Sequence, residues 1–203
     1  ALEWILAHEP HSPLEARAKM TLASVCRARQ EYQRYGLIMT EVFSNLRDIP
    51  AESQDELVEA LESVARQWAS EGHAADALVL AQKAQGICEE NPAFEQADHR
   101  ELRSFAGGLM HKLGQFENAR RLRELMVQEL IADPDVGRLD PQTMRASYAL
   151  AESLIELNEF ERSERILLSV IESAKEACEP QWASVSFELL TVQYLVRNMK
   201  REA

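Results

Sequence analysis

Histidines are the side chains of this sequence best suited to metal or acid–base chemistry, but their spacing supports neither. His8 and His11 stand three residues apart and could in principle contact one metal ion. Pro10 lies between them, however, and no third ligand is close in the sequence. The other histidines are too scattered to predict a catalytic or pH-sensing group: His73, His99 and His111. We expect no metal and no other cofactor.

The remaining candidates for chemistry have simpler interpretations. Gly107 and Gly108 lack the glycine spacing of a phosphate-binding loop and indicate a close helix crossing instead. Glu152 and Glu156 share one helix face at i, i+4, which is common on acidic surfaces. No serine lies in a nucleophile-elbow motif. We therefore expect the chain not to be an enzyme.

Composition narrows the possible partners and the cellular compartment. The 203 residues include 22 Lys and Arg against 34 Asp and Glu, a net charge of −12 that argues against general binding of nucleic acid. The cysteines are odd in number and include no C-x-x-C pair, as in a reducing compartment: Cys26, Cys88 and Cys178. No apolar run reaches the roughly 18 residues of a membrane span. These features favour a cytoplasmic protein without nucleic-acid or membrane partners.

Prolines punctuate the chain at a nearly constant period. They are separated by 40, 42, 42 and 46 residues: Pro10, Pro50, Pro92, Pro134 and Pro180. The pattern of apolar residues within each interval predicts two amphipathic helices. Repeats of this length predict stacked helical hairpins, which bury their apolar faces against one another and usually present a binding surface.

Aligning the intervals places residues that tolerate a left-handed backbone in one column. This column of turns between helices contains Gln30, Gly72, Gly114, Asn158 and Asn198. Small residues occur seven positions before most of these turns and five after, where we expect the paired helices to cross. The helices are predicted at 1–9, 13–29, 31–47, 53–71, 74–90, 95–113, 116–132, 141–157, 160–178 and 181–197. Ser12, Ser53 and Asp140 are the expected N-caps.

The segments around these turns resemble the tetratricopeptide repeat (TPR). They are LASVCRARQEY, VARQWASEGHAADA, AGGLMHKLGQFENA, LAESLIELNEFERS and LTVQYLVRNMKREA. The period of about 42 residues is similar to the longer copies in kinesin light chains and bacterial regulatory proteins. The resemblance implies an all-α, right-handed α-solenoid of antiparallel helix hairpins. We expect repeats at 11–50, 51–92, 93–136, 137–180 and, in part, 181–203, with 1–10 as the tail of a preceding repeat in a larger protein.

The resemblance also implies that the first helix of each hairpin lines a concave groove. The groove side chains would be Arg17, Met20, Ser24, Arg27, Glu59, Glu62, Arg66, Glu101, Ser104, His111, Lys112, Arg145, Tyr148 and Glu152. Met20, His111 and Tyr148 are the expected anchors for a ligand. Met20 and Ser24 replace the Lys/Asn clamp by which some relatives bind chaperone C-termini, so that function is not expected.

These features predict a protein-interaction scaffold that binds a peptide or helix of a partner. One alternative is a sensory or autoinhibitory arm of a larger signalling protein, such as a bacterial regulator, kinase or protease. Another is a response-regulator phosphatase-like repeat protein that uses an amide side chain, with Gln30, Gln67 and Gln193 as candidates by residue type. The helix at 181–197 is apolar around most of its circumference, which predicts end-to-end self-association.

Overall fold

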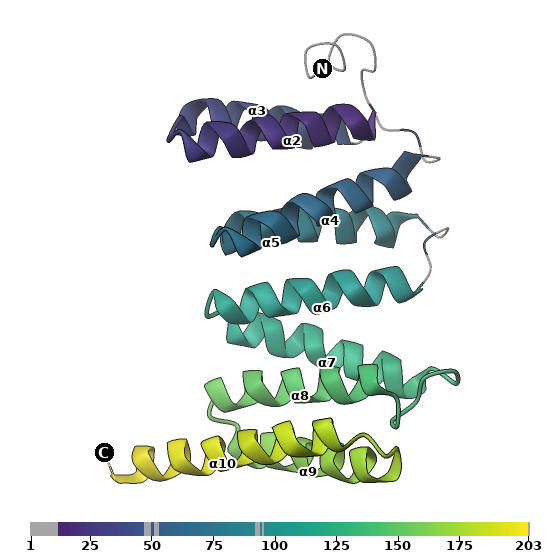
Figure 1. Ribbon diagram of the computed structural model, residues 1–203, viewed down its shortest axis with the longest axis vertical. Coiled ribbons are helices and arrows are strands. Elements are labelled where there is room, and N and C mark those ends of the chain that lie inside the picture. The colour runs from purple at the N-terminus through teal and green to yellow at the C-terminus, as the bar shows by residue number, and fades with distance from the viewer. Residues whose placement is uncertain (1–11, 47–49, 51–52, 92–93, 95, 203) are drawn as a thin grey trace. The chain divides into compact units, whose positions relative to one another are not determined.

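The computed structural model describes residues 12–46, 50, 53–91, 94 and 96–202. Within these ranges every regular element is an α-helix, which confirms the all-α prediction (Figure 1). In chain order the helices are α2 (Pro13–Ala28), α3 (Tyr32–Asn45), α4 (Gln54–Ser70), α5 (Ala74–Glu90), α6 (Gln96–Lys112), α7 (Phe116–Ala132), α8 (Pro141–Glu156), α9 (Phe160–Glu176) and α10 (Pro180–Glu202). The helix expected at 1–9 and the His8/His11 pair lie outside the described residues. The repeat boundaries stay a prediction.

The chain divides into two compact units, an N-terminal unit of residues 1–102 and a C-terminal unit of residues 103–203, with the division inside α6. In the N-terminal unit, α2 packs against α3 and α4, and α4 packs against α5 (Figure 1). In the C-terminal unit, α8 packs against α7 and α9, and α10 packs against α9 and α8. Each unit therefore consists of helical hairpins stacked on their neighbours.

The turns inside the hairpins share one geometry. Four of the five predicted turn residues have a positive φ: 62° at Gln30, 91° at Gly72, 73° at Gly114 and 63° at Asn158. At each turn the next residue donates its N–H to the carbonyl five residues back, as Gln115 does to Met110 at 2.9 Å. This bond satisfies a carbonyl that the end of the helix would otherwise leave unpaired.

The sequence prediction of turns was wrong at the C-terminal end. Asn198 lies inside α10, which continues to Glu202. Within the described residues no helix follows α10 and packs back on it, so no tertiary contact favours a turn at that position. Conversely, Cys178 has a φ of 59°, and Glu179 donates to Ala174 at 2.8 Å, so the connection from α9 to α10 repeats the same turn with a residue that gave no signal.

Two of the three predicted N-caps are confirmed. The Ser12 side chain accepts from the N–H of Glu15, and the Asp140 side chain accepts from the N–H of Gln142. Both precede a proline at the first turn of the helix, where the missing N–H costs no hydrogen bond. Ser53 makes no such bond, because its backbone is not in the extended conformation that directs a cap side chain at the helix.

Small residues lie where paired helices cross, as expected. Ala65, Ala77, Ala119 and Ala151 are all fully buried. In the C-terminal unit, the buried Ser163 hydroxyl of α9 donates to the carbonyl of Ala151 in α8 at 3.2 Å. Larger apolar side chains fill the space beside these crossings, and in this unit they form a cluster of Ala151, Leu167, Ile171 and Leu190. The small residues therefore fix how closely the helices of a hairpin approach.

Candidate functional site

The predicted groove residues divide into surface and interior positions. The exposed members are Arg17, Glu59, Arg66, Glu101, Ser104, Lys112 and Arg145, and the half-buried members are Ser24, Glu62, His111, Tyr148 and Glu152. Met20 and Arg27 are buried, with relative exposures of 0% and 7%. The prediction that Met20 anchors a ligand is therefore wrong, because this side chain packs in the core of its unit.

In the N-terminal unit, Arg27 joins neighbouring hairpins instead of facing a ligand. Its Nη1 lies 2.6 Å from Oδ2 of Asp76 in α5. The guanidinium also lies over the Trp68 ring of α4, 4.2 Å from the ring centroid. Trp68 in turn donates its Nε1–H to the Ser24 hydroxyl at 2.6 Å. Ser24 and Arg27 thus hold α2 against the following hairpin, and we correct the assignment of Arg27 to a groove.

Tyr35 borders this contact and has an altered acidity. Its ring lies 6.0 Å from the ring of Trp68 and 5.4 Å from the Arg27 guanidinium. Burial and the neighbouring Asp76 carboxylate raise the pKa of Tyr35 to about 12. The phenol therefore stays neutral throughout the physiological range and acts as a packing residue.

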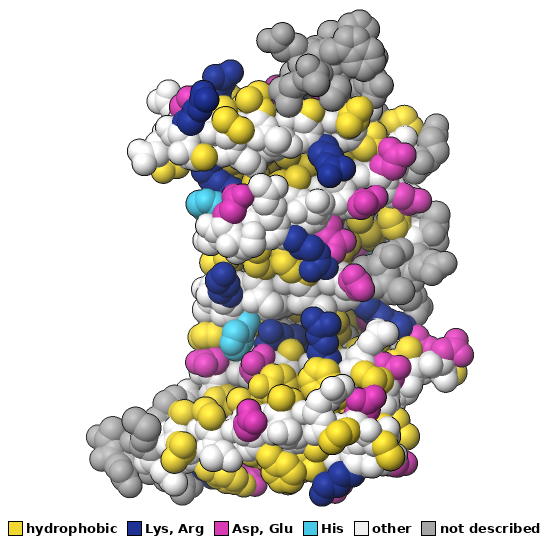
Figure 2. All heavy atoms as spheres, viewed as in Figure 1, with side chains coloured by type: hydrophobic (Ala, Val, Ile, Leu, Met, Phe, Trp, Pro, Cys, Tyr) yellow, Lys and Arg dark blue, Asp and Glu magenta, His cyan; other side chains and the backbone are white. Residues whose placement is uncertain are grey.

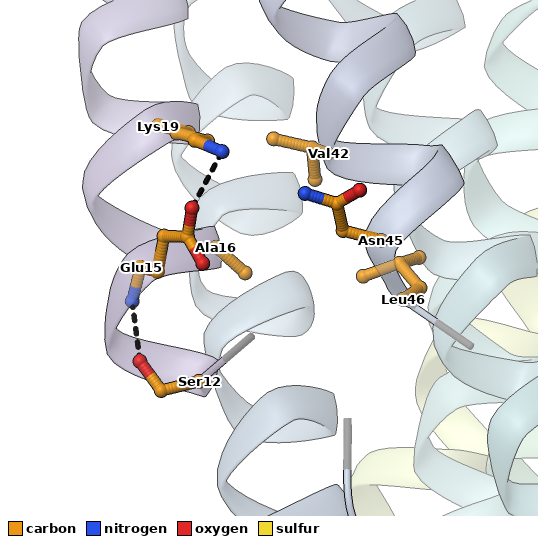
Figure 3. Close-up of a pocket in the computed structure, with 7 residues that line it drawn as sticks. All are labelled: Ser12, Glu15, Ala16, Lys19, Val42, Asn45 and Leu46. Carbon is orange, nitrogen blue, oxygen red and sulfur yellow. Dashed lines mark hydrogen bonds and ion pairs between the residues drawn. The ribbon is translucent and has the colours of Figure 1, made fainter. Parts of the chain in front are cut away.

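A small pocket lies at the other end of α2 and α3 (Figure 3). Its lining consists of Ser12, Glu15, Ala16, Lys19, Val42, Asn45 and Leu46, and its volume is about 10 Å³. That is the room of about one water molecule. Lys19 is buried beside it, with Nζ 2.6 Å from both Glu15 Oε1 and Glu41 Oε1. Burial acts to lower the pKa of Lys19, but these two carboxylates outweigh it and raise the pKa. The pocket holds a satisfied ion pair and is too small for an organic ligand.

In the C-terminal unit, α6 and α8 present a surface whose charged side chains are not held in ion pairs by other described residues. We call it the α6–α8 surface, and it comprises His111, Lys112, Arg145, Tyr148, Glu152 and Glu156. The charged side chains of this set make no ion pair within the described part of the chain. Figure 2 shows dark blue, cyan and magenta side chains gathered over α6 to α8 on this face.

On α7 and α9 of the same unit, charged side chains form ion pairs with one another. Arg120 of α7 contacts Glu117 at 2.6 Å and Glu124 at 2.8 Å. Arg162 of α9 contacts Glu124 and Glu159, both at 2.5 Å. The network joins α7 to α9 within the unit.

Aromatic and imidazole rings add to the α6–α8 surface. The half-buried Tyr148 lies 6.4 Å from Trp182 of α10, ring centroid to ring centroid. Burial raises the pKa of its phenol, with Glu152 and Glu188 acting in the same direction. The His111 ring packs edge-on against Phe116 at 5.2 Å. Burial and the Arg123 guanidinium lower the pKa of His111, while Glu152 and Glu156 act to raise it.

Arg123 is the residue that the sequence reasoning missed. It is 7% exposed, and its Nη1 donates to the Ala149 carbonyl at 2.6 Å and to the Ser153 hydroxyl at 2.7 Å, both in α8. The same atom lies 3.5 Å from Nδ1 of His111. A signal was present in the sequence, because the equivalent position nine residues after the turn is a buried apolar residue in the other hairpins: Met39, Ala81 and Leu167.

The glutamines that were candidates for a phosphatase have these surroundings. Gln193 is fully buried and donates its Nε2–H to the Phe160 carbonyl at 2.9 Å. Gln67 is exposed and donates to Glu71 on its own helix, and Gln30 occupies a turn. Among the described residues, no three His, Cys, Asp or Glu side chains are grouped to hold a metal ion. In the same ranges, no helix is both long and apolar enough to cross a bilayer.

Comparison with solved structures shows the fold. The crystal structure of BtubC (BKLC) from P. vanneervenii matches 90% of this chain with a TM-score of 0.59 and 17% identity. A putative kinesin light chain from Podosopora anserina, with nearly identical TPR-like repeats, matches 94% of this chain and 90% of its own length, with a TM-score of 0.64 and 16% identity. A variant of that kinesin light chain gives a TM-score of 0.62 at 16% identity over 96% of this chain and 92% of its own.

This chain spans 66%, just under two thirds, of the BtubC chain. No protein-family model matches the sequence, and comparison with curated protein sequences gives no significant match. The similarities therefore rest on the arrangement of the helices.

Proposed function

Because the chain has the fold of a TPR-type repeat protein, we propose that it is a non-catalytic scaffold that binds a segment of a partner protein on the α6–α8 surface. The observation that carries this proposal is the difference between the two sides of the C-terminal unit. Arg120 of α7 and Arg162 of α9 are joined to glutamates in a network of ion pairs, whereas Lys112, Arg145 and Glu152 on the α6–α8 surface have none within the described residues.

Tyr148 is the side chain of this surface best suited to anchor a partner. A half-buried tyrosine offers a large apolar face and a hydroxyl at little cost in conformational entropy, and such residues often dominate binding energy. Lys112, Arg145, Glu152 and Glu156 would fix the register of a peptide or helix by complementary charge.

The experiment is a pull-down from native lysate with the 203-residue chain, its Tyr148→Ala variant and a Tyr32→Ala control, followed by mass spectrometry. Tyr32 is 64% exposed on α3 and lies outside the proposed surface. We expect at least one protein to bind the parent chain and the control but not Tyr148→Ala. Its affinity, measured by calorimetry, should fall by about 30-fold, the size of a typical hot spot. Equal binding to all three chains would place the interaction elsewhere.

The same binding would serve an independent adaptor or the sensory arm of a larger signalling protein. A longer sequence that continues into a kinase, protease or DNA-binding domain would favour the sensory arm.

A second contact is proposed for α10. Its exposed apolar side chains are Phe187, Val192, Tyr194 and Leu195. Yellow side chains gather over α10 in Figure 2. An apolar patch of this kind would allow end-to-end association of two copies. A mass that stays monomeric at high protein concentration, by light scattering, would reject this contact.

A further inference from the structure

The position of Arg123 in the C-terminal unit is unusual for a charged residue. The side chain extends from α7 to the point where α6, α7 and α8 meet. Its stem passes Gly107 of α6, where an added Cβ would lie 3.6 Å from its Cγ. Its end reaches the α8 backbone at Ala149. The guanidinium is thus held in place from three helices.

The positive charge of Arg123 has no carboxylate in contact with it. No acidic side chain lies within ion-pair distance of Arg123 in the described residues, and the nearby Glu152 acts on it only through space. Burial lowers the pKa of Arg123 as a result. Arginine is rarely buried without a partner, because removing its charge from water is costly. A negative group supplied from outside would remove much of this cost.

The hydrogen-bonding edge that remains free on Arg123 suits such a group. Nη1 donates to Ala149 and Ser153, whereas Nε and Nη2 have no hydrogen-bond partner among the described residues. Some polar side-chain atoms of the described residues have neither solvent contact nor a hydrogen-bond partner, and Nη2 of Arg27 is one of them. Nε and Nη2 of Arg123 are not among these atoms. Nε and Nη2 of Arg123 therefore retain contact with solvent. Together they form the fork that donates two parallel hydrogen bonds to a carboxylate.

We propose that Arg123 receives a carboxylate of the bound protein, from an acidic side chain or a C-terminus, beside His111 at the α6–α8 surface. The proposal rests on the proposed function and names the chemistry of the partner. Glu152 and Glu156 lie near enough to influence His111 and limit how much negative charge the site accepts. A singly charged carboxylate is therefore favoured over a doubly charged phosphate.

The test uses acetate as the probe and the whole 203-residue chain. The Nε–Hε resonances of the arginines are followed by ¹⁵N NMR during titration with sodium acetate at constant ionic strength. Acetamide, which has the same shape but no charge, is the matched control, and sodium phosphate is the second anion. We expect a saturable shift of the Arg123 resonance with acetate, a smaller one with phosphate and none with acetamide.

Arg27 is an internal control, because it is equally buried but already contacts Asp76. Its resonance should not respond to acetate. Arg123→Lys keeps the charge but removes the fork and should weaken acetate binding by about tenfold, followed in both chains by the ring resonances of His111, whose Nδ1 lies 3.5 Å from Arg123 Nη1. Its fold is checked by circular dichroism, and Ser153→Ala, which keeps Arg123, supplies a second variant in which acetate binding should persist. Equal shifts with acetate and acetamide, or equal binding by Arg123→Lys, would overturn the proposal.

Failure of this inference can be told apart from failure of the proposed function. A partner that depends on Tyr148 but is insensitive to Arg123→Lys would remove the carboxylate site and keep the binding surface. If acetate binds at Arg123 but the partner is insensitive to Tyr148→Ala, the carboxylate site is retained and the proposed protein interface is rejected.

Discussion

Arg27 and Arg123 are equally buried, one in each unit, yet their environments differ. Arg27 has a carboxylate at 2.6 Å and an aromatic ring beneath its guanidinium. Arg123 has a backbone carbonyl, a hydroxyl and an imidazole, all of them uncharged groups or weak bases. The N-terminal unit therefore compensates its buried charge internally, and the contact stabilises the stack. The C-terminal unit places no carboxylate in contact with its buried charge, and Glu152 acts on that charge only through space, which is why we place ligand recognition there.

The largest effect should follow from replacing the ring that supports Arg27. Trp68 is fully buried, so Trp68→Ala leaves a cavity and removes the support of the guanidinium. We expect the free energy of unfolding to fall by about 3–5 kcal/mol in denaturant titrations. Met110 occupies the equivalent position of another hairpin and is half-buried, so Met110→Ala should cost clearly less. Equal losses would show that the Arg27 contact adds nothing special to the N-terminal unit.

A direct exchange of the two arginines for methionine sharpens the comparison. Arg27→Met separates α2 from Asp76 and should cost about 2 kcal/mol, a modest figure because the Asp76 side chain is 40% exposed. Arg123→Met should change stability by less than about 1 kcal/mol, since methionine already fills the equivalent position at Met39 and no ion pair is broken. Thermal or chemical unfolding of both variants measures the difference. A greater loss at Arg123 would mean that this residue is primarily structural.

The smallest effect concerns pH. The pKa of His111 is lowered by burial and by Arg123, so below the unfolded value of about 6.5 the unfolded chain binds more protons than the folded one. The contribution of His111 to stability should therefore be present above that pH and lost as the pH falls through its folded pKa.

His111→Gln should flatten this dependence in unfolding curves measured between neutral and mildly acidic pH. Removing the neighbouring charge with Arg123→Met should raise the pKa of His111 in an NMR titration. No change in that pKa would argue that the two side chains do not interact in solution.

The helices and most turns were predictable because they depend on local chemistry. A glycine or asparagine tolerates the positive φ that ends a helix, as at Gly114 and Asn158, and the repeat period indicated where such an end falls. The turn at Cys178 and the continuous helix through Asn198 depend on which helices pack nearby, and residue type does not report that.

The candidate site was less predictable for a related reason. The resemblance to the repeat family placed Tyr148 and His111 in the groove, but it cannot show how far a long side chain reaches. Arg27 was assigned to the same groove, although its side chain turns inward to Asp76. Arg123 was overlooked because it belongs to the second helix of its hairpin and reaches between two others. A charged residue in an otherwise apolar column was the signal to follow.

The shared turn geometry has a consequence for how the chain would respond to mechanical force. Gln30 and Cys178 adopt the left-handed backbone without being glycine, at a cost of about 1–2 kcal/mol each, whereas Gly72 and Gly114 adopt it almost freely. If the two ends of the chain were pulled apart, the turns at Gln30 and Cys178 would already carry backbone strain, whereas those at Gly72 and Gly114 would not. The connections at Gln30 and Cys178 should therefore yield at lower force than those at Gly72 and Gly114.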